Sequence, residues 1–412
     1  MPKYDVAVIG ASLGGLATAA LLACKKKKTI VIEQGSSLSD ALGVVEKSGF
    51  SFYAGPSLSY GFERNGAIHE FSARLGISQQ ITVPSPCYQV ALPDRRITVF
   101  ADRDSTLAEL RREFPREINA LYNLYRDLDK LRAQTAKSKI SAYFARSRSA
   151  AGYLGKYGFS RELMTFFDVQ SFAFFRKMVG KLSLSSFMML CDTPPRRVRG
   201  GFRKFGDQVY GVFLQHGGEV RYNEPSPELV LRGNRVIGIK TTQGVVEADT
   251  IILNALPHQR GIMLFIGLRE DVIPVGMSQD VYLLQDYSSP QDASVLSLNG
   301  NDDDAATPKR MRSLNVLFQL LPNRAKDEQM LVDKLSRLIP FLKDYIVFAE
   351  EFRPQAGYTV LPAGMHIQAL RIGGDLHILN QTSYYNAFVL QNLPEAPLQV
   401  LSVVQRLADK LC

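Results

Sequence analysis

The residues with the clearest chemical meaning lie near the start of the chain, where an apolar run ends in VIGASLGG at residues 8–15. In such a turn one glycine ends the strand, a second lets the backbone approach a phosphate, and a third lets the next helix pack closely. Gly10 and Gly15 hold the first and third positions, and Ser12 holds the second. Because a helix N-terminus attracts negative charge, the stretch predicts a pyrophosphate-binding turn.

A carboxylate follows at a suitable distance. Glu33 ends the second apolar run, KTIVIEQ, 23 residues after Gly10. A carboxylate at this place accepts hydrogen bonds from a ribose diol and disfavours a 2′-phosphate. The alternative is an ordinary solvated strand end, and the context favours the ribose contact.

These residues require a strand, a turn, a helix and a second strand to bring them together. YDVAVIG reads as a short strand, GGLATAALLACK as a helix of small residues, and KTIVIEQ as the next strand. The unit spans about 30 residues, the size of a dinucleotide-binding start. From 106 to 156 the chain reads as charged helices, strands follow from 218 to 255, and Pro397 opens a last helix.

The bulk composition narrows the class of protein. A chain of 412 residues with 46% hydrophobic and 22% charged residues is typical of a globular protein of two domains. It has no apolar stretch of membrane-spanning length and no signal-peptide pattern. The four cysteines lie far apart without metal-ligand spacing, so we expect free thiols, no metal and a cytoplasmic location.

The net charge of +9 is compatible with nucleic acid, an anionic membrane or plain solubility, and no nucleic-acid motif accompanies it. A basic cluster from Arg196 to Lys204 follows a segment rich in Phe and Met. Together they raise a peripheral membrane contact as a hypothesis, while a solvated basic loop over an ordinary core is the favoured interpretation.

The sequence resembles the phytoene (carotenoid) desaturase branch of the FAD-dependent amine oxidase superfamily. The resemblance rests on DVAVIGASLGGLATAALLA with VIEQ, on SGFSFYAGPSLSYGF, and on the stretch from GGFRKFGDQVYGVF through NRVIGIKTTQGVVEADTIILNALP. These pieces cover both ends and the middle of the chain.

The resemblance implies an α/β fold with an FAD/NAD(P)-type Rossmann domain built from 1–75, 195–262 and 352–412, and a substrate domain from 76–194 and 263–351. It implies FAD, and an oxidoreductase that moves a hydride between flavin and a hydrophobic, isoprenoid- or lipid-like substrate, as a desaturase or a reductase. The alternative is a catalytically silent relative that binds a lipid or a partner protein. The expected cofactor-binding residues are Gly10, Ser12, Leu13, Gly14, Gly15, Glu33, Gln34, Gly55, Ser226 and Ala255.

The chain also departs from that family. Where the family has Gly-Gly-Arg around the pyrophosphate, an ungapped count gives Ser39, Asp40 and Ala41, and a carboxylate there repels phosphate. The glycine-rich C-terminal motif reads LNQTSYYNAF at 379–388, where Asn380, Thr382 and Asn386 replace glycines and Tyr384 and Tyr385 add bulk. These changes predict FAD binding that is weakened or lost. No catalytic side chain is assigned, and His258 is a lone histidine after NALP.

Overall fold

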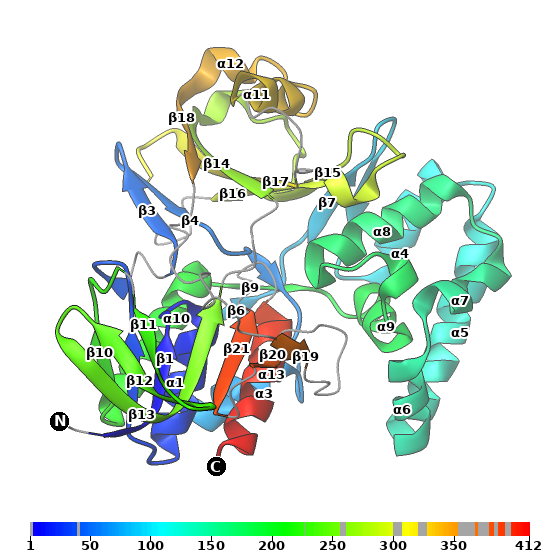
Figure 1. Ribbon diagram of the computed structural model, residues 1–412. Coiled ribbons are helices and arrows are strands. Elements are labelled where there is room, and N and C mark those ends of the chain that lie inside the picture. The colour runs from blue at the N-terminus through cyan, green and yellow to red at the C-terminus, as the bar shows by residue number, and fades with distance from the viewer. Residues whose placement is uncertain are drawn as a thin grey trace. The chain divides into compact units, whose positions relative to one another are not determined.

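The computed structural model describes residues 3–38, 42–225, 227–255, 261–299, 307–319, 328–352, 367–369, 379–382, 386–391 and 397–412. The chain divides into two compact units, each assembled from separate segments (Figure 1). Unit 1 comprises Met1–Ile81, Val198–Gln259 and Arg353–Cys412, and unit 2 comprises Thr82–Arg197 and Arg260–Phe352.

The centre of unit 1 is a nine-stranded sheet whose main order is β10-β2-β1-β13-β21-β20-β19. Strands β10, β2, β1, β13 and β21 pair in parallel, and β20 and β19 continue the sheet in antiparallel pairing. The hairpin strands β11 and β12 join at β13. The strands are β1 Tyr4–Ile9, β2 Thr29–Ile32, β10 Glu219–Arg221, β11 Glu228–Arg232, β12 Arg235–Thr241, β13 Gly244–Ala255, β19 Ile367–Ala369, β20 Leu379–Thr382 and β21 Ala387–Gln391.

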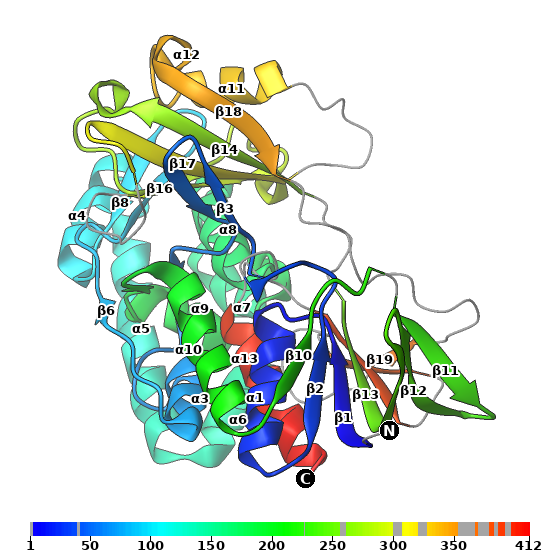
Figure 2. The same ribbon diagram turned by 90° about the vertical axis from the view of Figure 1, so that its left-hand side faces the viewer.

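Four helices build the core on one face of this sheet, as Figure 2 shows. They are α1 Leu13–Cys24, α3 Ala67–Leu75, α10 Gly201–Gln215 and α13 Pro397–Lys410. Successive strand residues alternate between faces, so Val6 and Val8 join the helix-covered core, while Ala7 and Ile9 join a second core with Ile239 of the hairpin. A parallel sheet buried on both faces is a Rossmann-type arrangement, which confirms the α/β class.

Two small sheets are separate from the two large ones. They are β3 Val44–Lys47 and β4 Phe50–Tyr53, which pair with each other, and the three-stranded set β5 Leu58–Ser59, β9 Arg196–Val198 and β6 Ile81–Thr82.

Unit 2 contains a seven-stranded sheet in the order β18-β14-β17-β16-β15-β7-β8. Its strands are β7 Tyr88–Ala91, β8 Arg96–Val99, β14 Gly261–Arg269, β15 Asp280–Leu283, β16 Ser294–Asn299, β17 Met311–Gln319 and β18 Ile346–Phe352. Helices α11 Glu328–Ser336 and α12 Leu342–Tyr345 bury Leu335 and Leu342 against one face. Tyr282 points from the other face to Phe174, with ring centroids 5.4 Å apart.

A group of helices accounts for the rest of unit 2 (Figure 1). They are α4 Arg103–Glu113, α5 Ile118–Lys137, α6 Lys139–Ser147, α7 Ala150–Leu154, α8 Arg161–Phe175 and α9 Leu184–Asp192. The Phe- and Met-rich segment lies in α8 and α9, where Phe166, Phe167 and Phe187 are buried against one another, so these side chains belong to the core. In the described part of the chain, no helix is both long and apolar enough to cross a bilayer.

Candidate functional site

The glycine turn follows β1 and depends on backbone conformations that only glycine supplies. Gly10 has φ of 101°, in the region where a side chain is strained. A Cβ on Gly15 would lie 2.1 Å from the carbonyl oxygen of Gly10 and 2.8 Å from the amide nitrogen of Asn254. Both glycines are therefore required by the close approach of α1 to the strand ends.

Helix α1 begins directly after Ser12, so its N-terminus faces this turn. The first-turn residues Leu13, Gly14 and Gly15 are buried, and their N–H groups have no acceptor inside the helix. The first turn carries no acidic residue, and its free amides and dipole form a local region of positive potential. The arrangement suits a phosphate group.

Glu33 lies beside the turn, at the end of the neighbouring strand. Its carboxylate is 4% exposed and accepts hydrogen bonds from the backbone N–H of Ala11 at 2.5 Å and of Gly35 at 2.9 Å. Each carboxylate oxygen has a second lone-pair site, which leaves acceptor capacity for hydroxyl groups. The structure thus brings Glu33 and the glycine turn together, as the sequence predicts.

Asn254, at the end of β13, is a site residue that sequence reasoning missed. Its side-chain amide donates to the Gly10 carbonyl at 3.2 Å and to the Ser12 hydroxyl at 2.5 Å. The residue is 1% exposed, and its Oδ1 atom has no hydrogen-bond partner. The signal was available in TIILNALP, because a polar residue directly follows the apolar run of a central strand.

The end of β10 forms the next wall of the site. The backbone N–H of Glu224 donates to the carbonyl of Glu33 at 3.1 Å, and its buried carboxylate accepts from Thr242 N–H at 2.7 Å. The Gln34 amide donates to the carbonyl of Pro225 at 2.9 Å. Gln34 is thus fixed against the segment that leads to Ser226, which itself lies outside the described residues.

Two further expected residues have different surroundings. Gly55 follows β4, where a Cβ would lie 2.2 Å from the ring of Tyr53, so a close ring contact explains this glycine. Ala255 is the last residue of β13 and pairs with Gln391 of β21, which places it at the same strand end as Asn254. Its backbone is therefore at the carboxyl edge of the sheet.

Comparison with known proteins gives the site a family context. No family model matches the chain. It is 24% identical over 285 residues to a chloroplastic prolycopene isomerase from Arabidopsis thaliana, which is 61% of this chain and 47% of that protein. It is also 24% identical over 304 residues to a 4,4'-diapophytoene desaturase from Methylomonas sp, covering 67% of this chain and 58% of that protein. The chain spans about half the length of these relatives.

Solved structures share the fold. An oxidoreductase from Methanosarcina mazei has a TM-score of 0.65 at 14% identity, covering 98% of this chain and 100% of the other. Cyclohexylamine oxidase from Brevibacterium oxydans IH-35A has a TM-score of 0.59 at 14% identity, covering 100% and 99%. In sequence the chain is similar to a prolycopene isomerase and a diapophytoene desaturase, and it shares the fold of an amine oxidase.

One expected departure from the superfamily is wrong. Asn386 immediately precedes β21, whose first residue, Ala387, pairs in parallel with Ile251 of β13. The glycine turn instead meets the other end of β13, because Ile9 pairs with Leu253. Asn386 therefore lies at the amino edge of the sheet.

The side chain of Asn386 has a structural role at that edge. It accepts from Val236 N–H at 3.1 Å and donates to the carbonyls of Val236 and Asp249, each at 2.7 Å. Asn386 does not crowd a cofactor. Asn380 and Thr382 lie in β20, which pairs antiparallel with β21, and the departures at 39–41 and 384–385 lie outside the described residues.

The remaining sequence candidates do not form a second centre. Arg197 of the basic cluster pairs with Asp280 and donates to Gln279, and Arg199 donates to Gln80. The four cysteines are free, and no cluster of metal-ligating side chains occurs among the described residues. His258 lies outside them.

The described residues fit the adenine half of the superfamily's FAD. Gly15 lets α1 pack closely against the Gly10 carbonyl and Asn254, which holds the N-terminus of the helix at the turn. Ser12 accepts its hydrogen bond from Asn254, so its own O–H proton is available to a phosphate oxygen. Glu33 places a carboxylate beside the turn, a group that can accept hydrogen bonds from ribose hydroxyls.

Proposed function

We propose that the protein is an FAD-dependent oxidoreductase, a desaturase or a reductase, acting on a hydrophobic isoprenoid- or lipid-like substrate. The observation that carries this proposal is the meeting of the glycine turn, Glu33 and Asn254 at the carboxyl edge of one parallel sheet. Ligands of open α/β sheets bind at this edge. The relatives are named for carotenoid isomerisation and desaturation, which supports a polyene as the substrate class.

The chain's own residues would bind and orient the cofactor. The N–H groups of Leu13, Gly14 and Gly15 would face the pyrophosphate, with Ser12 as an added donor. Glu33 would accept from the ribose hydroxyls.

The segment next to Gln34 and Pro225, with Ser226, would meet the adenine, and the backbone at Ala255 and Gly55 would line the same cofactor. In this assignment unit 1 is the dinucleotide domain and unit 2 the substrate domain. Bound flavin supplies the acceptor or donor of a hydride, and no catalytic side chain is assigned.

The test begins with the purified protein. We expect flavin absorption bands in the protein as isolated or after FAD is added. We also expect the FAD-loaded protein to desaturate 4,4'-diapophytoene when an electron acceptor is present. The gain of conjugated double bonds is measured as a red shift of the polyene absorption.

The matched control is Gly15→Leu, whose side chain clashes with the Gly10 carbonyl and Asn254, displaces α1 from the turn and should abolish both signals. Failure of the wild type to bind either FAD or ADP would contradict the proposal. It would favour the silent relative.

A further inference from the structure

Helix α6 is oriented with its large apolar side chains toward solvent. Ile140, Tyr143 and Phe144 are 70%, 68% and 56% exposed, and they occur at i, i+3 and i+4. This spacing places them on one face of the helix. The opposite face carries the small residue Ala145, which is 3% exposed. A helix that merely covered a core would show the reverse pattern.

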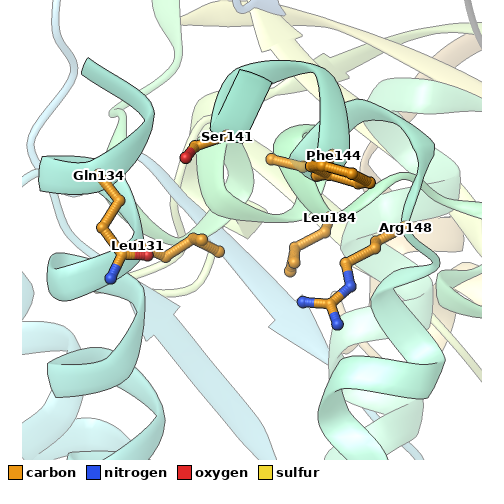
Figure 3. A pocket seen from close by; sticks show the side chains of 7 residues that line it. Leu131, Gln134, Ser141, Phe144, Arg148 and Leu184 are labelled. Carbon is orange, nitrogen blue, oxygen red and sulfur yellow. The ribbon is translucent and has the colours of Figure 1, made fainter. Parts of the chain in front are cut away.

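A groove lies next to this apolar stripe. It has a volume of about 390 Å³ and is bordered by Leu131 and Gln134 of α5, by Phe144 of α6, and by Arg148 and Leu184. Figure 3 shows Phe144, Leu184 and Arg148 around the same opening. The exposed apolar surface therefore continues into a recess with a cationic group at its border.

The stretch of sequence that contains α6 carries charges of a single sign. Between Asp129 and Glu162 the sequence contains eight basic residues and no acidic residue: Lys130, Arg132, Lys137, Lys139, Arg146, Arg148, Lys156 and Arg161. Lys137, Arg146 and Arg148 flank the stripe and are exposed. In the described part of the chain none of these three forms an ion pair. An exposed apolar stripe with uncompensated cations on both sides matches an anionic bilayer surface.

We propose that α6 is a membrane-docking element, which inserts Ile140, Tyr143 and Phe144 into the interface of an anionic bilayer. Lys137, Arg146 and Arg148 then lie at the level of the lipid headgroups. The apolar side chains are removed from water, and the cations approach anionic lipid. The proposal does not depend on FAD or on any substrate. It also differs in place from the Arg196–Lys204 cluster, where Arg197 and Arg199 are bound to other residues.

The experiment is co-sedimentation of the full chain with vesicles of phosphatidylcholine alone and of phosphatidylcholine with phosphatidylglycerol. We expect binding to the anionic vesicles that falls as salt increases. The variant Ile140→Ser with Tyr143→Ser should lower the partition coefficient by at least about tenfold. Both side chains are largely exposed, so an unchanged melting curve checks that the variant folds.

Matched controls distinguish vesicle binding through α6 from non-specific adsorption. Val275→Ser removes another exposed apolar side chain in unit 2 and should bind as the wild type does. Lys137→Gln with Arg146→Gln should weaken binding, whereas Arg116→Gln with Arg232→Gln removes the same charge elsewhere and should not. Gly15→Leu should leave vesicle binding unchanged, which separates this test from the proposed function.

Two results would overturn the proposal. One is equal vesicle binding by the wild type and by Ile140→Ser with Tyr143→Ser, or no binding by either. The other is self-association in analytical ultracentrifugation that the same double variant abolishes without any vesicle binding. The stripe would then be an interface between copies of this chain.

Discussion

The side-chain amide of Asn254 donates a hydrogen bond to the hydroxyl of Ser12 across 2.5 Å. Asn254 ends β13, and Ser12 stands where the superfamily's turn has its second glycine. The same amide also donates to the Gly10 carbonyl, so one buried side chain holds two points of the turn. The serine is therefore part of the local hydrogen-bond network of this site.

The first prediction concerns this pair. Asn254→Ala leaves the buried Gly10 carbonyl without its side-chain donor, and we expect ADP affinity to fall by about fivefold to tenfold. In a Ser12→Gly background the same change should cost less, with a coupling of roughly 1 kcal/mol. Isothermal titration calorimetry with ADP, on the wild type, the two single variants and the double variant, measures this double-mutant cycle. Additive effects would show that the hydrogen bond does not support nucleotide binding.

Gly15 gives a steric prediction. Gly15→Ala places a Cβ 2.1 Å from the Gly10 carbonyl oxygen, so α1 must move away from the strand ends. We expect ADP binding to be lost and the melting temperature to fall. Gly211→Ala in α10 is the control, because no atom lies within 4 Å of its Cβ. It should raise the stability by up to about 1 kcal/mol. Unchanged ADP affinity in Gly15→Ala would argue against this turn as the site.

Asp40 gives a prediction about the flavin half. Because it falls where the superfamily binds pyrophosphate through glycine, we expect FAD to bind no more tightly than ADP. Asp40→Gly should then strengthen FAD binding and leave ADP binding similar. Titration of the apoprotein with each ligand measures both. Tight FAD binding by the wild type, far stronger than ADP binding, would mean that Asp40 turns away from the phosphates.

Asp168 gives a pH-dependent prediction in unit 2. Burial raises the pKa of this carboxyl group, and the hydrogen bond from Val179 N–H at 2.7 Å opposes the rise only in part. The folded state then binds the proton more strongly than the unfolded state, so ionisation of Asp168 lowers stability as the pH rises.

Asp168→Asn keeps an acceptor for Val179 and cannot ionise. It should raise the melting temperature at neutral pH, and the gain over wild type should shrink toward about pH 4. Thermal melts across this range test the idea. A difference that stays constant with pH would contradict it.

Asp192 gives a stability prediction for the helical part of unit 2. Its side chain is 3% exposed and contacts Arg103 at 2.7 Å, with Arg132 as a second partner. Asp192→Ala leaves both arginines without this acid, and we expect a loss of about 3 kcal/mol. Asp129 pairs with the same Arg103 but is 48% exposed, so Asp129→Ala should cost less than about 1 kcal/mol. Urea unfolding measures the free energy of unfolding of both variants. Equal losses would contradict the larger stabilising role predicted for Asp192.

The sequence predicts the parts of this protein that depend on local pattern. The glycine turn and Glu33 share one strand–helix–strand unit, so their meeting follows from the motif, and the α/β class is confirmed. Asn254 could not be placed in the same way. Its contact with Ser12 depends on the pairing of β1 with a strand more than two hundred residues later.

The misplacement of Asn386 has a physical reason as well. β20 and β21 are consecutive antiparallel strands, and the expected motif was matched to the segment that contains β20 and the start of β21. Consecutive antiparallel strands end at opposite edges of a sheet, so an error of one strand moves a residue from the carboxyl edge to the amino edge. Similarly, the apolar periodicity around α6 indicates a helix, but only the structure shows that its stripe is exposed.

The order of the segments in unit 1 has a consequence for synthesis on the ribosome. Helix α1 forms among the first residues, yet it packs against α13, whose Val400, Leu401 and Val404 complete the same core. A nascent chain that lacks α13 therefore exposes apolar surface of α1 while all the residues between the two helices are synthesised. The nucleotide turn can reach its final packing only after α13 has left the ribosome, and until then the chain is a natural client for chaperones that bind apolar surface.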